Sequence, residues 1–130
     1  RRKHALNTFP VDVMKRWLEV NGAAAARRIA PCLPLPFVTP DGSPVGPALT
    51  EFVLERFEDD DVYAAFAHGR HNGQIYRGDI AAQHEAEAAR AAPFRNHPLR
   101  RIRQWANEEV AAARRRAQCW RERHEEDFGD

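Results

Sequence analysis

Apolar residues recur at steps of three and four over most of the chain, which is the spacing that predicts amphipathic α-helices. The longest such stretch begins at His97 and reaches Asp127; it contains no glycine and, after Pro98, no further proline. We expect one long helix here, with Asn96 as its N-cap and Pro98 in its first turn. Its apolar stripe needs a covering surface and consists of Leu99, Ile102, Ala106, Val110, Ala113, Ala117 and Trp120.

Five shorter helices are predicted before the long one. The first two are separated by the pair Asn21-Gly22, because this pair is a typical helix stop. An acidic run at 58–61 precedes the fourth helix, and Asp79 is the expected N-cap of the fifth. The five helices are expected at about residues 10–20, 23–30, 47–57, 58–68 and 79–92.

A proline-rich segment separates the second helix from the third. Six of the nine prolines lie in residues 31–47. Proline fixes φ and has no N–H, so this segment forms neither a helix nor a central strand. Its apolar side chains, such as Leu33 and Phe37, predict a strap packed across helices rather than a solvated linker. No stretch of the chain alternates with a period of two residues, so no sheet is predicted.

These elements predict an all-α fold of about six helices in antiparallel pairs, with a Pro-rich strap and a long C-terminal helix. The length of 130 residues fits a single helical domain, 1–130. It would comprise a lead-in (1–8), two helical hairpins (9–68), a loop (69–78) and the fifth helix with the long C-terminal helix (79–130). The stripes place nine large residues in the core, and truncating Trp17 to Ala should then cost about 3–5 kcal/mol. The nine are Trp17, Leu18, Leu49, Phe52, Phe57, Phe66, Ile102, Val110 and Trp120.

Composition indicates the source and the cellular compartment of the protein. The chain opens with Arg1 and not with methionine, which indicates a piece of a longer protein or a processed product. Its excess of arginine over lysine, with many alanines, fits a GC-rich bacterial genome. Cys32 and Cys119 have no metal-ligand spacing, which favours buried, unreactive thiols in a reducing cytoplasm. No apolar run approaches the roughly 20 residues that cross a bilayer, so no membrane partner is expected.

Candidate catalytic and metal-binding residues are few. His68 and His71, followed by His84-Glu85, are the nearest approach to a ligand cluster, but a spacing of three in a glycine-rich loop is not that of a helical zinc motif. Ser43 is the only serine and lies in a predicted turn without the frame of a nucleophilic serine. The sequence therefore predicts no metal, no cofactor and no enzymatic activity.

Charge is unevenly distributed although the totals nearly balance, with 20 basic and 19 acidic residues. Residues 90–124 hold ten arginines against three acidic residues, a local balance of +7, and residues 51–61 hold six acidic residues against one arginine, a balance of −5. Two interpretations remain open: a solvated helix face that pairs with an acidic surface, or a surface for the phosphates of a nucleic acid. The second would use Arg100, Arg101, Arg103, Arg114, Arg115 and Arg116.

Two pairs of short helical segments follow one another at a spacing of about 37 residues. VDVMKRWLEV precedes GAAAARRIA, and ALTEFVLERF precedes DVYAAFAH. This arrangement, over residues 9–68, resembles HEAT-type α-solenoid repeats. The resemblance implies a HEAT-like scaffold at the C-terminal end of a large bacterial helical-repeat protein, with no catalytic residue. We therefore expect a non-enzymatic protein-interaction module and cap, whose partners are other domains of the parent protein or a separate protein; binding of nucleic acid is the alternative.

Overall fold

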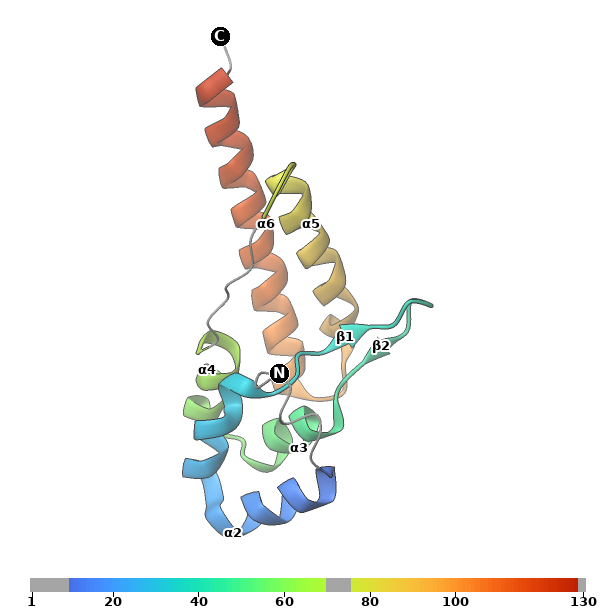
Figure 1. The fold of residues 1–130 in the computed structure, drawn as a ribbon, viewed down its shortest axis with the longest axis vertical. Coiled ribbons are helices and arrows are strands. Elements are labelled where there is room, and N and C mark those ends of the chain that lie inside the picture. Colours follow the sequence, from blue (N-terminus) through green and yellow to red (C-terminus); the bar gives the residue numbers. More distant parts are fainter. Residues whose placement is uncertain (1–9, 70–75, 129–130) are drawn as a thin grey trace. The chain divides into compact units, whose positions relative to one another are not determined.

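The computed structural model describes residues 10–69 and 76–128, which are mostly helical (Figure 1). The coarse prediction of an all-α protein is confirmed. The chain divides into two compact units, Arg1–Asn72 and Gly73–Asp130. The first unit contains α2 (Val11–Ile29), η2 (Ala30–Cys32), β1 (Phe37–Val38), β2 (Pro44–Val45), α3 (Ala48–Arg56) and α4 (Asp60–His68); the second contains α5 (Ile80–Ala91), η3 (Ala92–Asn96) and α6 (Arg100–Phe128).

Helix α2 breaks at Gly22. This glycine has φ 76° and ψ −166°, a conformation open almost only to glycine, and the chain turns sharply there (Figure 1). The Asn21 side chain donates a hydrogen bond to the Trp17 carbonyl at 2.8 Å, which satisfies a carbonyl at the end of the first half. The helix stop predicted at Asn21-Gly22 is therefore correct. The described residues contain five α-helices where the sequence predicted about six, because the two predicted helices form one element with a corner.

The core of the first unit forms where α2 contacts both α3 and α4, and where α4 contacts η2. Alanines let the second half of α2 and the start of η2 approach their neighbours closely, since Ala26 and Ala30 are fully buried. Larger side chains from the first half of α2, from α3 and α4, and from the start of the strap fill the remaining space. The most deeply buried of them are Leu18, Leu33, Val53, Leu54, Val62 and Phe66.

The proline-rich strap is anchored to α3 and carries a small sheet that the sequence did not predict. Thr50 is fully buried, and its hydroxyl donates to the Pro34 carbonyl at 2.6 Å. Beyond this anchor, β1 and β2 pair antiparallel, with Phe37 opposite Val45. The prediction of no sheet was wrong, because strands of two residues are too short to show an alternating pattern.

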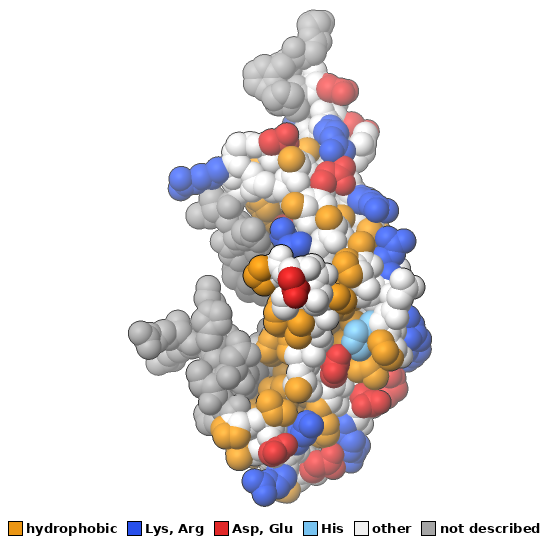
Figure 2. All heavy atoms as spheres, turned by 90° about the vertical axis from the view of Figure 1, so that its right-hand side faces the viewer, with side chains coloured by type: hydrophobic (Ala, Val, Ile, Leu, Met, Phe, Trp, Pro, Cys, Tyr) orange, Lys and Arg blue, Asp and Glu red, His pale blue; other side chains and the backbone are white. Residues whose placement is uncertain are grey.

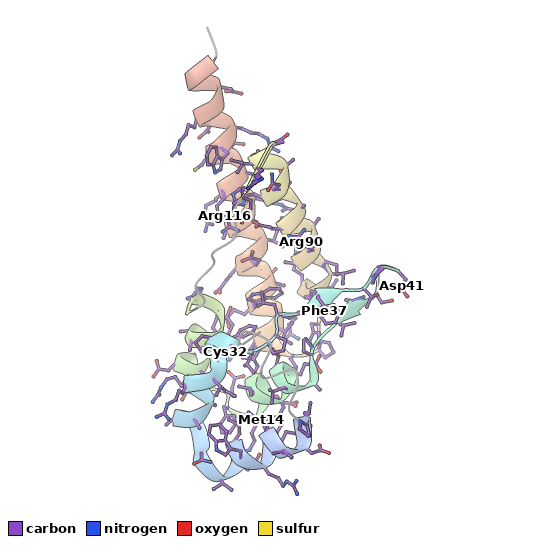
Figure 3. All side chains as sticks on the ribbon, in the orientation of Figure 1. Met14, Cys32, Phe37, Asp41, Arg90 and Arg116 are labelled. Atoms are coloured by element: carbon purple, nitrogen blue, oxygen red, sulfur yellow. The ribbon has the colours of Figure 1, made fainter. Side chains whose placement is uncertain are left out.

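The turn between β1 and β2 is held by its polar side chains (Figure 3). Thr39 N–H donates to the Ser43 carbonyl at 2.8 Å, and Ser43 N–H donates to the Asp41 carboxylate at 3.0 Å. A hydrogen bond from the Thr39 hydroxyl, together with those from Ser43, lowers the pKa of Asp41 below its usual value. Gly42, with φ 91°, completes the turn.

Two helices begin at aspartate caps: Asp59, which lies in the predicted acidic run, and Asp79, the predicted cap. The Asp59 side chain accepts from Asp61 N–H at 2.7 Å and from Val62 N–H at 3.2 Å. The Asp79 side chain accepts from Ala82 N–H at 2.9 Å. These three bonds satisfy amides that a helix start leaves without an internal partner.

In the second unit, α5 and α6 lie antiparallel and side by side, joined through η3 (Figure 1). Alanines line their contact, and Ala88, Ala106, Ala113 and Ala117 are all buried. The predicted start of the long helix was wrong. Asn96 ends η3, and the His97 ring nitrogen Nδ1 accepts from Leu99 N–H at 3.0 Å, so α6 begins at Arg100.

The predicted core is only partly correct. Leu18, Leu49, Phe57, Phe66, Ile102 and Val110 are buried, and Phe52 is half-buried. Trp17 and Trp120 were wrongly assigned to it, since they are 41% and 38% exposed. Phe94 and Trp105 are buried aromatic residues that the prediction missed, and their rings meet edge to face at 6.1 Å.

Candidate interaction surfaces

The first half of α2 has two apolar faces. One carries Met14, labelled in Figure 3, and the fully buried Leu18. The other carries Val13, Trp17 and Val20, which recur at steps of four and three and so share one side of the helix. They are 45%, 41% and 83% exposed, and we refer to these three residues as the outer stripe. A helix with a second apolar face has the pattern of one that packs between two neighbours.

A narrow polar strip borders the outer stripe. It consists of Asp12, Arg16 and Glu19, all exposed. Arg56 of α3 holds Glu19 through two hydrogen bonds, from Nε at 2.9 Å and from Nη2 at 3.2 Å. The strip therefore contains one carboxylate fixed by the fold and one exposed guanidinium, Arg16.

The six arginines predicted to bind phosphate occupy different environments. Arg101 is only 6% exposed and donates to Gln104 at 3.0 Å. Arg103 donates from Nη1 to the carbonyls of His97 and Pro98, both at 2.8 Å, and thereby supports the turn before α6. These two arginines and Arg116 therefore form contacts within the second unit.

Arg100, Arg114 and Arg115 are exposed. Arg100 lies 14 residues before Arg114, which at about 1.5 Å per residue separates them by roughly 21 Å along α6. Basic and acidic side chains are interspersed over the face shown in Figure 2. The structure therefore brings together Arg114, Arg115 and the partly paired Arg116 on α6, and not a continuous row of six.

Arg116 belongs to a polar cluster that the sequence did not reveal. Its Nη2 lies 3.1 Å from Glu87 Oε1 and 3.5 Å from Glu109 Oε2 (Figure 3). His84 Nδ1 lies 2.7 Å from the same Glu87 oxygen, and the Tyr76 hydroxyl donates to the other oxygen of Glu87. One carboxylate on α5 thus joins α5, α6 and the segment that leads into α5.

The cluster sets the protonation of its two carboxylates in opposite directions. Burial raises the pKa of Glu87, but hydrogen bonds from Tyr76, His84 and Arg116 outweigh it, so the pKa lies below its usual value. Burial also raises the pKa of Glu109, and the attraction of Arg116 does not cancel that rise. Glu87 is therefore the carboxylate that the cluster stabilises as an anion.

His84 lies between Glu87 and Arg116. Its Nδ1 lies 2.7 Å from a Glu87 carboxylate oxygen and 3.3 Å from Arg116 Nε, so the ring contacts a side chain of α5 and one of α6. The ring is 3% exposed, so a substrate has little access to it. This arrangement is a buried polar connection between two helices.

The other candidate residues lie apart from one another. Among the described residues, no group of three histidine, cysteine or acidic side chains is placed to hold a metal ion. His68 is exposed at the end of α4, and His71 lies outside the described residues. The prediction of buried thiols was wrong, because Cys32 and Cys119 are both exposed.

The second unit contains an open cavity of about 550 Å³ between the start of α5 and the far part of α6. Trp120 forms part of its wall, and the Arg123 guanidinium lies over the Trp120 ring at 5.3 Å. Arg121, also in the wall, pairs with Glu85 at 2.8 Å. Trp120 is exposed because it lies at the opening of this cavity.

Two further comparisons, with membrane-spanning helices and with known proteins, give no functional assignment. Within residues 10–69 and 76–128, none of the helices combines the length and the apolar character that crossing a bilayer requires. The chain matches no protein-family model, no curated protein and no solved structure.

Proposed function

We propose that the protein is a non-enzymatic interaction module that binds another protein surface through the outer stripe of α2. The observation that carries this proposal is the exposure of Trp17 beside the fully buried Leu18. Large aromatic side chains dominate the energy of protein interfaces, and an exposed tryptophan flanked by valines is typical of such a surface.

The HEAT-like pattern supports the same proposal. In helical-repeat proteins each helix pair buries its second face against the next pair. The outer stripe would be that second face, and the chain would serve as the C-terminal cap of a larger bacterial, cytoplasmic protein whose other domains are its partners. The proposal requires no cofactor and no catalytic group.

A photo-crosslinking amino acid placed at Val20 tests the proposal in the native cell. Val20 is the most exposed stripe residue, and the matched control is the same amino acid at Arg28, which is exposed on the other half of α2. We expect a discrete adduct from position 20 that disappears in the Trp17→Ala background. Equal labelling from positions 20 and 28, or an adduct that persists without Trp17, would contradict the proposal.

Stability measurements on variants of two neighbouring residues test which face of α2 supports the fold and which face binds a partner. Leu18→Ala should lower the free energy of unfolding by about 2–5 kcal/mol, because the side chain is fully buried. Trp17→Ala should cost distinctly less, and not the 3–5 kcal/mol expected for a core tryptophan, while it removes binding. An equal loss in the two variants would show that Trp17 supports the fold.

Binding of nucleic acid is the second candidate function. It is supported by the exposure of Arg100, Arg114 and Arg115 on α6. Such binding would be tolerant of sequence, since phosphate contacts carry no base code. Its affinity would fall with salt by a log–log slope of about −0.9 for each phosphate neutralised on duplex DNA.

A further inference from the structure

We propose that the open cavity of the second unit binds a small organic cation with an apolar body. The cavity measures about 550 Å³, within the roughly 300–1,000 Å³ that is typical of small-molecule sites. Its wall comes from residues 78–82 on one side and from Trp120, Arg121 and Glu125 of α6 on the other. All of them belong to the second unit, so this inference does not depend on the outer stripe of α2.

The cavity exists because α6 continues past the start of α5 (Figure 1). Where the two helices lie side by side, alanines such as Ala117 pack tightly and are fully buried. Beyond that contact, Gly78, Ala81 and Ala82 have small side chains and do not fill the space beside Trp120. The two segments therefore leave a hollow of the size of a small molecule.

The apolar part of the wall suits a flat or aliphatic group. Trp120 is exposed, and the Arg123 guanidinium lies over its ring at 5.3 Å without forming part of the wall. The surface of the indole that lines the cavity is therefore available to a ligand, and Ile80 extends it with aliphatic surface. Tryptophan is also the side chain whose ring attracts a cation most strongly.

Two carboxylates in the wall favour a positive charge on the ligand. Glu125 is exposed, and Asp79 accepts a hydrogen bond from Ala82 N–H at 2.9 Å as the cap of α5. Within residues 10–69 and 76–128, no basic side chain pairs with either carboxylate. Arg121 in the same wall is already paired with Glu85 at 2.8 Å.

The neighbouring positive charges do not reverse this preference. The start of α5 carries a partial charge of about +0.5, which the full negative charge of Asp79 exceeds. Arg77 and Arg123 are exposed and lie outside the wall, where solvent and salt screen their charges. With Glu85 counted against Arg121, the wall keeps a net negative charge.

An NMR titration of the full chain with benzamidinium tests the inference. Benzamide and benzoate have nearly the same shape and differ in charge, so they are matched controls. We expect a saturable shift of the Trp120 indole N–H signal, with Trp17 and Trp105 unaffected, and millimolar affinity for so small a ligand. Benzamide should bind roughly three- to tenfold more weakly, because it lacks the attraction of two exposed carboxylates, and benzoate should not bind. No saturable shift with benzamidinium, or equal binding of the three compounds, would overturn the inference.

Conservative variants test whether the wall carboxylates attract the ligand. Glu125→Gln and Asp79→Asn each remove one charge, and asparagine keeps a capping oxygen for α5. Each should weaken benzamidinium about two- to fivefold, the scale of an exposed ion pair, and leave benzamide unchanged. Glu122→Gln makes the same change at an exposed position of α6 outside the wall and should have no effect. Equal weakening by Glu122→Gln and Glu125→Gln would contradict a site in this cavity.

Trp120→Leu tests the apolar wall. It should weaken benzamidinium and benzamide alike by about tenfold, because it removes the aromatic surface on which both rings pack. The backbone amides of Ala81 and Ala82 report binding in this variant, and circular dichroism confirms that the helices are kept. Unchanged affinity for benzamidinium in Trp120→Leu would refute the proposed site.

Discussion

The corner at Gly22 is a precise point at which to perturb the first unit. With φ 76° and ψ −166°, the residue occupies a region that costs an L-amino acid about 1–3 kcal/mol. No heavy atom lies within 4 Å of an added Cβ, so the cost of Gly22→Ala comes from the backbone and not from a clash. Alanine also lowers the conformational entropy of the unfolded chain, which stabilises the folded state by about 0.4–1 kcal/mol. The net loss in the free energy of unfolding should be about 1–2 kcal/mol.

Urea unfolding followed by circular dichroism measures this loss, and amide hydrogen exchange locates it. Protection should fall in α2, α3 and α4 and stay unchanged in α5 and α6, because the corner belongs to the first unit. D-alanine at position 22, introduced by semisynthesis, is the matched control, since this φ is ordinary for a D-residue and stability should be kept or raised. If Gly22→Ala is more stable than the parent and gains helical signal, the chain runs straight through residue 22 and the reasoning is refuted.

Three further predictions concern the caps and the charged residues. Asp59→Ala should cost about 1 kcal/mol of unfolding free energy, because it removes the acceptor for two amides at the start of α4. The pKa of Glu87 is lowered in the folded state. Its contribution to stability is therefore complete above the usual pKa of 4.5 and is lost as pH falls through the folded-state pKa. Glu87→Gln should remove that part of the acid dependence of stability, measured by thermal unfolding at a series of pH values. If α6 binds duplex DNA, replacing Arg114 and Arg115 by Gln should reduce the salt slope by one to two units in a fluorescence titration.

Each of these predictions has a control within the chain. Asp59→Asn keeps a capping oxygen and should retain most of the stability of the parent. Glu85→Gln alters an exposed carboxylate paired with Arg121, and it should leave the acid dependence nearly unchanged because surface pairs contribute little. An unchanged salt slope in the double arginine variant would assign any DNA binding to other residues. Arg116 is left intact because its loss would also break the contact with Glu87.

Local chemistry explains which parts of the fold could be predicted from the sequence. Asp79 was identified as a cap, and the acidic run that contains Asp59 was placed at the start of the fourth helix, because short acidic side chains there satisfy amides only a few residues away. Gly22 was identified as a stop for an equally local reason, its freedom to adopt positive φ. Such interactions join residues that are neighbours in sequence, so the order of the residues is enough to predict them.

Choices between neighbouring candidates needed the three-dimensional structure. Asn96 and His97 both have a side chain able to accept a hydrogen bond, and the bonding of Leu99 N–H to His97 decided where α6 begins. Trp17 and Leu18 both lie in apolar stripes, and periodicity identifies two faces without saying which one meets the core. The packing of α2 against α3 and α4 buried the face of Leu18.

The arginine-rich helix shows that the contacts of a candidate site also cannot be predicted from the sequence alone. A local balance of +7 counts charges and ignores partners from distant parts of the sequence. Glu87 lies 29 residues before Arg116, and their contact exists only because α5 and α6 lie antiparallel. The number of arginines available to a phosphate could be judged only after such contacts were known.

The two halves of α2 provide an internal comparison for the outer stripe. The second half, beyond the corner at Gly22, has Ala24 and Arg27 at exposed positions. Arg27 lies 3.8 Å from Asp61 of α4, so a charged residue fits at an outward position of this helix. The fold therefore does not require Trp17 and Val20 to be apolar. Exposed apolar side chains of this size promote association, and their presence where a charge fits equally well supports a role in binding.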